Sequence, residues 1–309
     1  MIVLVLVTSN MFMFGLVAVF GERAPVAGFL AQTVIFLLMM LLSVWLGGRL
    51  LDRRRFADFG MGLDHAWWVD FGVGLILGGL MMALIFGVEW SAGWIGLAGT
   101  FRTAPSLRAP FGLVILAPLL SYICVGIREE VPRGYVLRNL AEGLNVPCIG
   151  ARRAIMLAWL LSSAGFGLLH AMNPHATIMS TVNIMMAGML LGLPYIVTGR
   201  LGLSIGLHIT WNFFQGNVFG FPISGGGIGM ATLIATVEQG PDLWTGGAFG
   251  PEAGLVGVAA MVLACLLVLV WVRYSDRQAT LHLPLARYTP RSSTRTPSIK
   301  RRVSAHAQM

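Results

Sequence analysis

Charged side chains are scarce in this sequence. They make up 11% of its 309 residues, while apolar residues make up 56%. A soluble domain carries roughly 25% charged residues, so this chain has too few to cover a water-exposed surface. The three cysteines (Cys124, Cys148 and Cys265) are odd in number and lack CxxC spacing, which predicts neither a disulfide framework nor a zinc ribbon. No HExxH motif is present, which excludes a zincin as a motif match.

Apolar runs recur along the chain. Runs of about 18 or more residues are long enough to cross a hydrocarbon core of about 30 Å. The first run has no positively charged start, so we expect a retained span rather than a signal peptide. The sequence predicts an all-α fold, a polytopic membrane helix bundle. Its eight expected spans lie near residues 1–20, 27–47, 67–88, 111–127 and onward, 154–172, 176–197, 202–219 and 254–272.

Basic residues gather on one side of these spans. Alternate connections and the tail hold 18 of the 21 lysines and arginines, and the other side keeps only Arg23, Arg102 and Arg108. The positive-inside rule therefore places both termini in the cytoplasm, and we expect a multi-pass protein of the cell membrane. The basic tail can touch anionic lipid headgroups. Its charges are not interleaved with a series of aromatic residues, so no nucleic-acid partner is expected.

Five regions follow from this reading. They are the first three spans with their loops (1–109), the core that carries the chemistry (110–220), an external Gly/Pro-rich loop (221–253), the last transmembrane helix (254–273) and a basic disordered cytoplasmic tail (274–309). A short re-entrant segment around Ile228–Val237 is expected within the loop. Gly74 and Gly78 share one helix face, as do Gly188 and Gly192, and such pairs allow close helix packing in lipid.

Two adjacent carboxylates form the first candidate site. Glu129 and Glu130 follow an apolar run without a helix stop, and ionisable groups within spans mark function by default. Adjacent carboxylates repel when both are ionised, so one of the pair is suited to exchange a proton as a general base. On a helix, Arg133 can pair with either. A charge cluster at the cytoplasmic edge, without catalysis, is the alternative.

Two histidines lie in separate spans. His170 follows Phe166 at i+4, and His208 precedes Asn212 at i+4 on one helical face. Each needs a polar partner in hydrocarbon. Two chemistries remain open. A glutamate and a histidine could activate water while His208 and Asn212 stabilise the oxyanion, or His170, His208 and Glu129 could bind a divalent metal such as zinc that activates the same water.

These residues resemble the motifs of the CPBP family of intramembrane proteases, which includes the type II CAAX prenyl endopeptidases. The family pattern is EExxxR, FxxxH and HxxxN/D. Phe166–His170 matches the second motif and His208–Asn212 the third, within about residues 110–220. The resemblance implies an eight-span core that cleaves a peptide or a lipidated protein C-terminus. It also implies that the first glutamate is the base, His170 holds the water, and His208 with Asn212 forms the oxyanion site.

The first motif departs from the family pattern. Two residues separate the glutamate pair from Arg133, where the family has three. Counted from the preceding helix, Glu129 is the base and the arginine positions the pair. If the family motif is instead aligned on Arg133, Glu129 occupies the position of the second glutamate and Arg128 that of the first, catalytic glutamate. We adopt the first register.

The depth of the glutamates adds a further requirement. If the fourth span ended at Ile127, the pair would lie at the cytoplasmic edge, far from His170 at 1.5 Å per residue. We therefore predict that this helix continues past Pro132 to about Glu142, and that a proline kink absorbs the lost residue.

The leading hypothesis is an intramembrane endopeptidase that acts near the cytoplasmic face. The shortened first motif favours an alternative, a catalytically degenerate family member that acts as an immunity or partner-binding scaffold. A proton-coupled transporter is a third reading, but the chain lacks the paired interrupted helices typical of an inverted repeat.

Overall fold

The computed structural model describes residues 25–107, 109–226, 230–276 and 279–288. The predicted first span and residues 289–309 lie outside them. The long helices are α2 (Pro25–Leu46), α3 (His65–Ser91), α5 (Leu116–Leu144), α6 (Gly150–His170), α7 (Ile178–Thr198), α8 (Gly202–Phe213) and α10 (Leu255–Asp276). The shorter elements are β1 (Ile95–Thr103), α4 (Phe111–Val114), β2 (Ala231–Glu238) and α9 (Asp242–Thr245).

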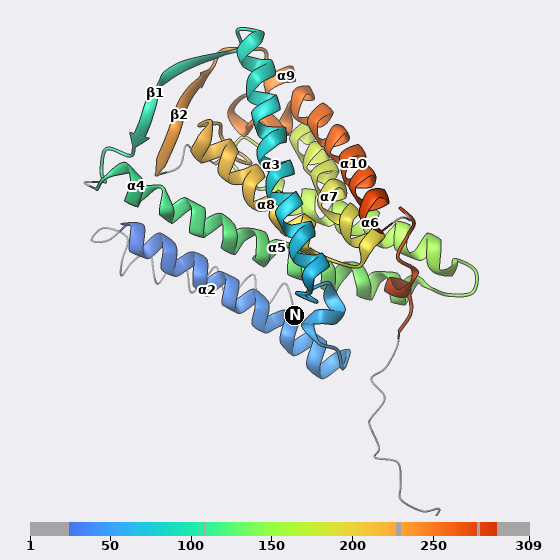
Figure 1. Cartoon of the computed structure of the whole chain (residues 1–309). Helices are drawn as coiled ribbons and strands as arrows, with labels where there is room; N and C mark the ends of the chain where they lie inside the picture. The colour runs from blue at the N-terminus through green and yellow to red at the C-terminus, as the bar shows by residue number, and fades with distance from the viewer. Residues whose placement is uncertain (1–24, 108, 227–229, 277–278, 289–309) are drawn as a thin grey trace, which may run out of the picture.

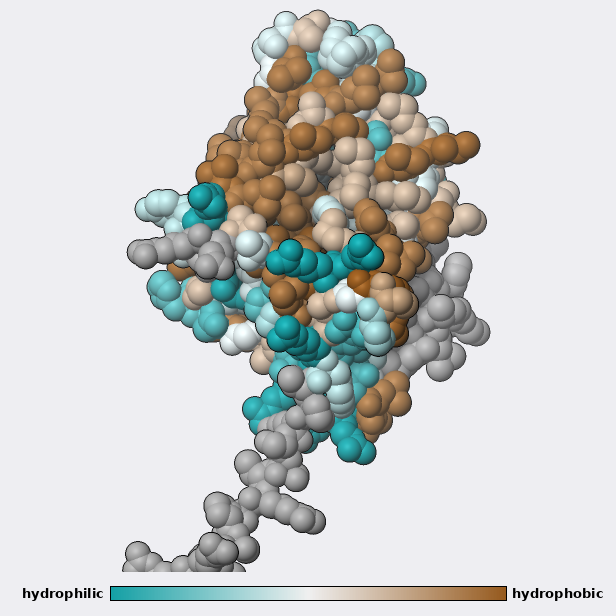
Figure 2. All heavy atoms as spheres, turned by 90° about the vertical axis from the view of Figure 1, so that its right-hand side faces the viewer, coloured by the Kyte–Doolittle hydropathy of each residue, from teal (hydrophilic) through white to brown (hydrophobic). Residues whose placement is uncertain are grey.

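Six of the described helices are long and apolar enough to cross a membrane, namely α2, α3, α5, α6, α7 and α10. Side chains such as Leu38, Ile76 and Val270 are exposed on them, as expected for a lipid-facing surface. Figure 2 shows hydrophobic side chains over much of one face and hydrophilic ones gathered toward its lower end. A mostly helical membrane fold is therefore confirmed, whereas the orientation of the termini stays a prediction.

The predicted count of eight spans is not confirmed. The span expected at 202–219 is α8, a helix of 12 residues that a π-helical turn at Phe214–Val218 extends. Most of its residues are buried, and in Figure 1 it lies beside α3, α5 and α7, which it contacts. It is an interior helix of the bundle.

Small residues bring α3 and α8 into close contact. A Cβ atom added at Gly74 would lie 2.3 Å from the Leu203 carbonyl oxygen, and one at Gly78 would lie 2.4 Å from the Leu207 carbonyl oxygen. Gly206 of α8 lies equally close to the backbone of α3. Such contacts are what the Gly74 and Gly78 spacing predicts. They also join the first predicted region, 1–109, to the core.

A two-stranded antiparallel sheet corrects the all-α prediction. Strand β1 pairs with β2, with Ile95 opposite Glu238 and Thr103 opposite Ala231. The re-entrant segment expected around Ile228–Val237 is therefore wrong, because its described part is strand. Half of the residues in ATLIATVE are β-branched, which is typical of a strand, but the partner strand β1 lies more than 120 residues earlier in the sequence. Figure 1 shows the sheet at one end of the bundle.

Helix α5 is the long helix that the site requires. It runs without a break from Leu116 to Leu144 with Pro132 in its interior, which confirms the predicted continuation to about Glu142. At its C-terminal end, Glu142 pairs with Arg54 at 2.6 Å and with Arg138 at 2.9 Å. These ion pairs fix the arginine-rich end of the helix.

The described residues after α10 dock against the helix bundle. Residues 283–286 form a helical turn whose Leu285 and Ala286 side chains are buried, and Asn145 donates a hydrogen bond to the Ala286 carbonyl at 2.7 Å. The expectation of disorder from residue 274 onward is therefore wrong for 279–288. Two further hydrogen bonds hold this segment in place, from Arg138 to the Pro284 carbonyl at 3.4 Å and from the His282 backbone N–H to the Ile196 carbonyl at 2.8 Å.

Candidate active site

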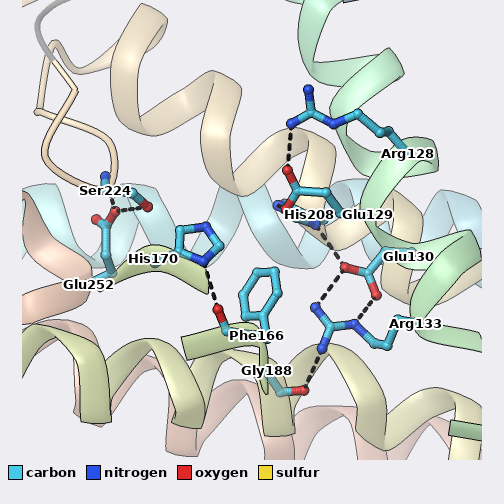
Figure 3. A network of polar contacts seen from close by, with 10 residues as sticks. All are labelled: Arg128, Glu129, Glu130, Arg133, Phe166, His170, Gly188, His208, Ser224 and Glu252. Carbon is cyan, nitrogen blue, oxygen red and sulfur yellow. Dashed lines mark hydrogen bonds and ion pairs between the residues drawn. The ribbon is translucent and has the colours of Figure 1, made fainter. Parts of the chain in front are cut away.

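The adjacent glutamates near the midpoint of α5 face different partners. Glu129 lines an internal cavity, and its Oε1 atom accepts a hydrogen bond from Arg128 at 2.6 Å. Glu130 points away from this cavity and is completely buried. Consecutive residues on a helix differ by about 100° in direction, so the pair serves two separate environments (Figure 3).

Glu130 joins Arg133 to His208. Arg133 donates from Nε to Oε2 at 2.7 Å and from Nη2 to Oε1 at 3.3 Å. The Nδ1 atom of His208 lies 2.9 Å from Oε1 of the same carboxylate. Because the carboxylate is bound through both oxygens by a guanidinium, it is the acceptor and His208 Nδ1 carries the proton. The Nε2 atom of His208 lies 3.8 Å from Oε2 of Glu129.

His170 is held by its own helix. Its Nδ1 atom lies 2.8 Å from the Phe166 carbonyl oxygen. A carbonyl only accepts, so Nδ1 is the donor, and in the neutral ring Nε2 has the free lone pair. The centroids of the Phe166 and His170 rings lie 4.6 Å apart. The Arg133 guanidinium lies 4.2 Å from the centroid of the Phe166 ring. Phe166 thus separates the arginine from the histidine and contacts both.

One cavity brings the predicted residues together. Its volume is about 200 Å³, and Glu129, His170, His208 and Asn212 all line it. Most of the remaining lining is apolar. These other residues are Tyr122, Val125, Phe166, Ile184, Ala187, Leu190, Leu191, Leu207, Trp211, Ile223, Ser224, Glu252 and Met261. Glu130 and Arg133 are the predicted residues that stand behind this lining rather than in it.

The cavity lies farther from the arginine-rich helix ends than predicted. His170 is the last residue of α6, whose first turn holds Arg152 and Arg153. Ser224 and Glu252 belong to the connection that the charge pattern places on the opposite face. His170 therefore lies at the opposite end of α6 from Arg152 and Arg153, and the expected position near the cytoplasmic face stays a prediction.

Sequence reasoning missed Glu252. It lies in the turn before α10, is 3% exposed, and accepts hydrogen bonds from the Ser224 backbone, the Ser224 hydroxyl and the Gln215 amide. Burial raises the pKa of its carboxyl to about 7, although the bonds from Ser224 and Gln215 act in the opposite direction. A glutamate in a Gly/Pro-rich loop carries no helical spacing that would have marked it.

The arrangement of these side chains does not fit the zinc site that the sequence offers as one possibility. Among the described residues, no three His, Cys, Asp or Glu side chains are grouped so that they could hold a metal ion. The proposed set of His170, His208 and Glu129 lines one cavity, but Glu129 is engaged by Arg128. Binding of a divalent metal therefore stays a prediction from the sequence.

Fold and cavity together define a multi-pass helical membrane protein with a carboxylate and histidine site inside its bundle. Residues 111–214 match the family described as type II CAAX prenyl endopeptidase Rce1-like. This match confirms the resemblance and assigns that segment, which carries every residue of the three motifs, to the CAAX protease family. No curated protein and no solved structure matches the chain.

Proposed function

We propose that this protein is a CAAX-type intramembrane endopeptidase that hydrolyses a peptide bond in the cavity between α5, α6 and α8. The observation that carries the proposal is that Glu129, His170, His208 and Asn212, from three helices, line one cavity. Buried polar side chains that converge in an apolar cavity are typical of an active site. The family match over residues 111–214 supports the same reaction class.

Glu129 is the proposed general base. Its carboxylate lines the cavity, and the ion pair with Arg128 at 2.6 Å restricts its orientation. His170 offers Nε2 as an acceptor because Nδ1 donates to the Phe166 carbonyl. A water held between the two acceptors would lose a proton to Glu129 as its oxygen attacks the carbonyl carbon. The same proton then passes to the leaving nitrogen when the C–N bond breaks.

His208 and Asn212 are the proposed oxyanion site. His208 can donate from Nε2 only as imidazolium, because Nδ1 already donates to Glu130. The Glu130 carboxylate compensates that charge, and Arg133 in turn fixes Glu130 through two hydrogen bonds. The Asn212 amide would supply a second donor one helical turn from His208. Donors placed in advance where negative charge develops are worth several kcal/mol in the transition state.

The proposed substrates are lipidated protein C-termini or peptides that reach the site from the bilayer of the cell membrane. The family acts at prenylated C-termini by its description, and the apolar cavity lining suits chains partly embedded in lipid. Purified full-length chain in lipid nanodiscs should release the C-terminal tripeptide from a farnesylated CAAX peptide. Glu129→Gln should abolish release, and Glu142→Gln, which breaks ion pairs at the far end of α5, should retain it. Equal release by the Glu129→Gln variant would refute the proposal.

A further inference from the structure

Glu252 gives the cavity a second polar wall, opposite the proposed catalytic groups. Figure 3 shows Glu252 and Ser224 on one side of His170, with Glu129 and His208 on the other. All five residues line the same cavity. The wall is well fixed, because Asn173 donates a hydrogen bond to the Ser224 carbonyl at 2.9 Å.

Glu252 differs from the other two site carboxylates in its charge balance. Glu129 is paired with Arg128 at 2.6 Å, and Glu130 is paired with Arg133 at 2.7 Å. Within the described ranges, Glu252 forms no ion pair, and its three hydrogen-bond donors are all neutral. A buried carboxylate without a cation is costly. A cationic ligand in the cavity would remove that cost.

The Ser224 hydroxyl extends the polar surface beside Glu252. The Oε1 atom of Glu252 accepts from both the backbone nitrogen and the hydroxyl of Ser224, and Oε2 accepts from Gln215. The Ser224 hydroxyl, which donates to Oε1, keeps lone pairs that can accept a hydrogen bond from the compact ammonium group of a lysine. The rigid fork of a guanidinium needs two parallel acceptors.

The surrounding lining suits the rest of such a side chain. Leu207, Ile223 and Met261 border the same cavity, and the aliphatic stem of a lysine packs well on apolar surface. We propose that Glu252 and Ser224 form a subsite that binds the ammonium group of a lysine in the substrate peptide, close to the scissile bond. This inference rests on the proposed function only in calling the bound peptide a substrate.

The test measures binding without turnover. Full-length Glu129→Gln protein in nanodiscs is titrated with fluorescent peptides that carry lysine or norleucine at one position, moved stepwise from three residues before the cleaved bond to three after it. At one position the lysine peptide should bind at least tenfold more tightly. The double variant Glu129→Gln/Glu252→Gln should bind both peptides equally. Its binding of the norleucine peptide also shows that the cavity is folded.

A matched control uses Glu238, which lies in the same connection and bonds to Thr245 outside the cavity. Glu129→Gln/Glu238→Gln should keep the preference for lysine. Equal binding of lysine and norleucine at every position overturns the subsite, as does a preference that survives Glu252→Gln. Absence of binding by every peptide overturns both the subsite and the endopeptidase. Lysine-selective binding together with no cleavage by the wild-type chain supports the subsite and counts against the proposed function alone.

Discussion

The Nδ1 atom of His208 lies 2.9 Å from Glu130 Oε1, across the contact between α8 and α5. This bond links the third family motif to the first, and Arg133 completes it from one turn further along α5. In the proposed mechanism, the second glutamate of the pair would therefore act on the oxyanion donor rather than on the water. In that mechanism the two glutamates have different roles, because consecutive residues on a helix point in different directions.

Replacing Glu130 by glutamine should lower kcat by about 10²-fold with little change in KM. A neutral amide cannot compensate a His208 imidazolium, and the loss of one oxyanion donor costs that much. An interaction made only in the transition state changes kcat rather than binding. Steady-state cleavage of a CAAX peptide by purified protein measures both constants. Glu142→Gln, which also removes a carboxylate bound to arginines, is the control, and a Glu130→Gln variant within threefold of wild type would contradict this role.

The sequence was sufficient to predict that Glu129, His170, His208 and Asn212 come together at one cavity, because the constraints on them are local. Helical spacing places Phe166 beside His170 and His208 beside Asn212, and the cost of burying polar groups in lipid brings them together. The length of α5 followed from the same requirement, since Glu129 had to reach the depth of His170. These features depend on rise per residue and hydrogen bonding, which sequence spacing encodes.

Other features depend on contacts between distant segments, which one sequence does not encode. Strand β2 needs β1 as its partner, and Glu252 meets Ser224 and Gln215 only after the connection before α10 has folded back over α8. Burial of Leu285 likewise depends on contacts with distant residues of the chain, such as the bond from Asn145 to the Ala286 carbonyl. The prediction of a disordered tail from residue 274 onward rested on its basic composition alone.

Replacing Gly78 by alanine should destabilise the protein and reduce its activity. The new methyl group would lie 2.4 Å from the Leu207 carbonyl oxygen, so α3 and α8 would have to separate at a cost of about 1–3 kcal/mol or more. Because His208 lies on α8, the site would shift as well. Thermal unfolding in detergent measures the effect. Gly87→Ala on the same helix, where no atom lies within 4 Å, should be neutral or stabilise by about 0.5–1 kcal/mol, and equal losses in both variants would contradict the close contact.

Stability should decrease as the pH rises from about 4.5 to 7, with Glu252 as one source. Its pKa is raised from 4.5 to about 7 by burial, so the native state holds this proton more tightly than the unfolded chain. Its contribution is complete below pH 4.5 and is lost as the pH passes through 7. At most it amounts to roughly 3 kcal/mol. Unfolding temperatures of wild type and Glu252→Gln across this range should show a shallower slope in the variant. Identical slopes would rule out Glu252 as the titrating group.

Removal of divalent metal should leave cleavage unchanged. Within the ranges that the structure describes, no three-ligand group is available, and Glu129 is paired with Arg128. Peptide release after dialysis against EDTA or 1,10-phenanthroline, with and without added zinc, measures the dependence. A loss that zinc restores would show that the side chains rearrange around a metal and would return the mechanism to the zinc reading.

An alanine inserted between Val131 and Pro132 should abolish activity, although it restores the family spacing of the first motif. In this chain Arg133 reaches Glu130 from three residues away and binds both its oxygens, so the shorter motif already makes the bond. One added residue turns all that follows by about 100° and would direct Arg133 away from both Glu130 and Phe166. The degenerate-scaffold alternative predicts the reverse, an inactive native chain that gains activity on insertion. Peptide release by the two chains, at equal folded protein, therefore separates an enzyme adapted to the short motif from a catalytically degenerate scaffold.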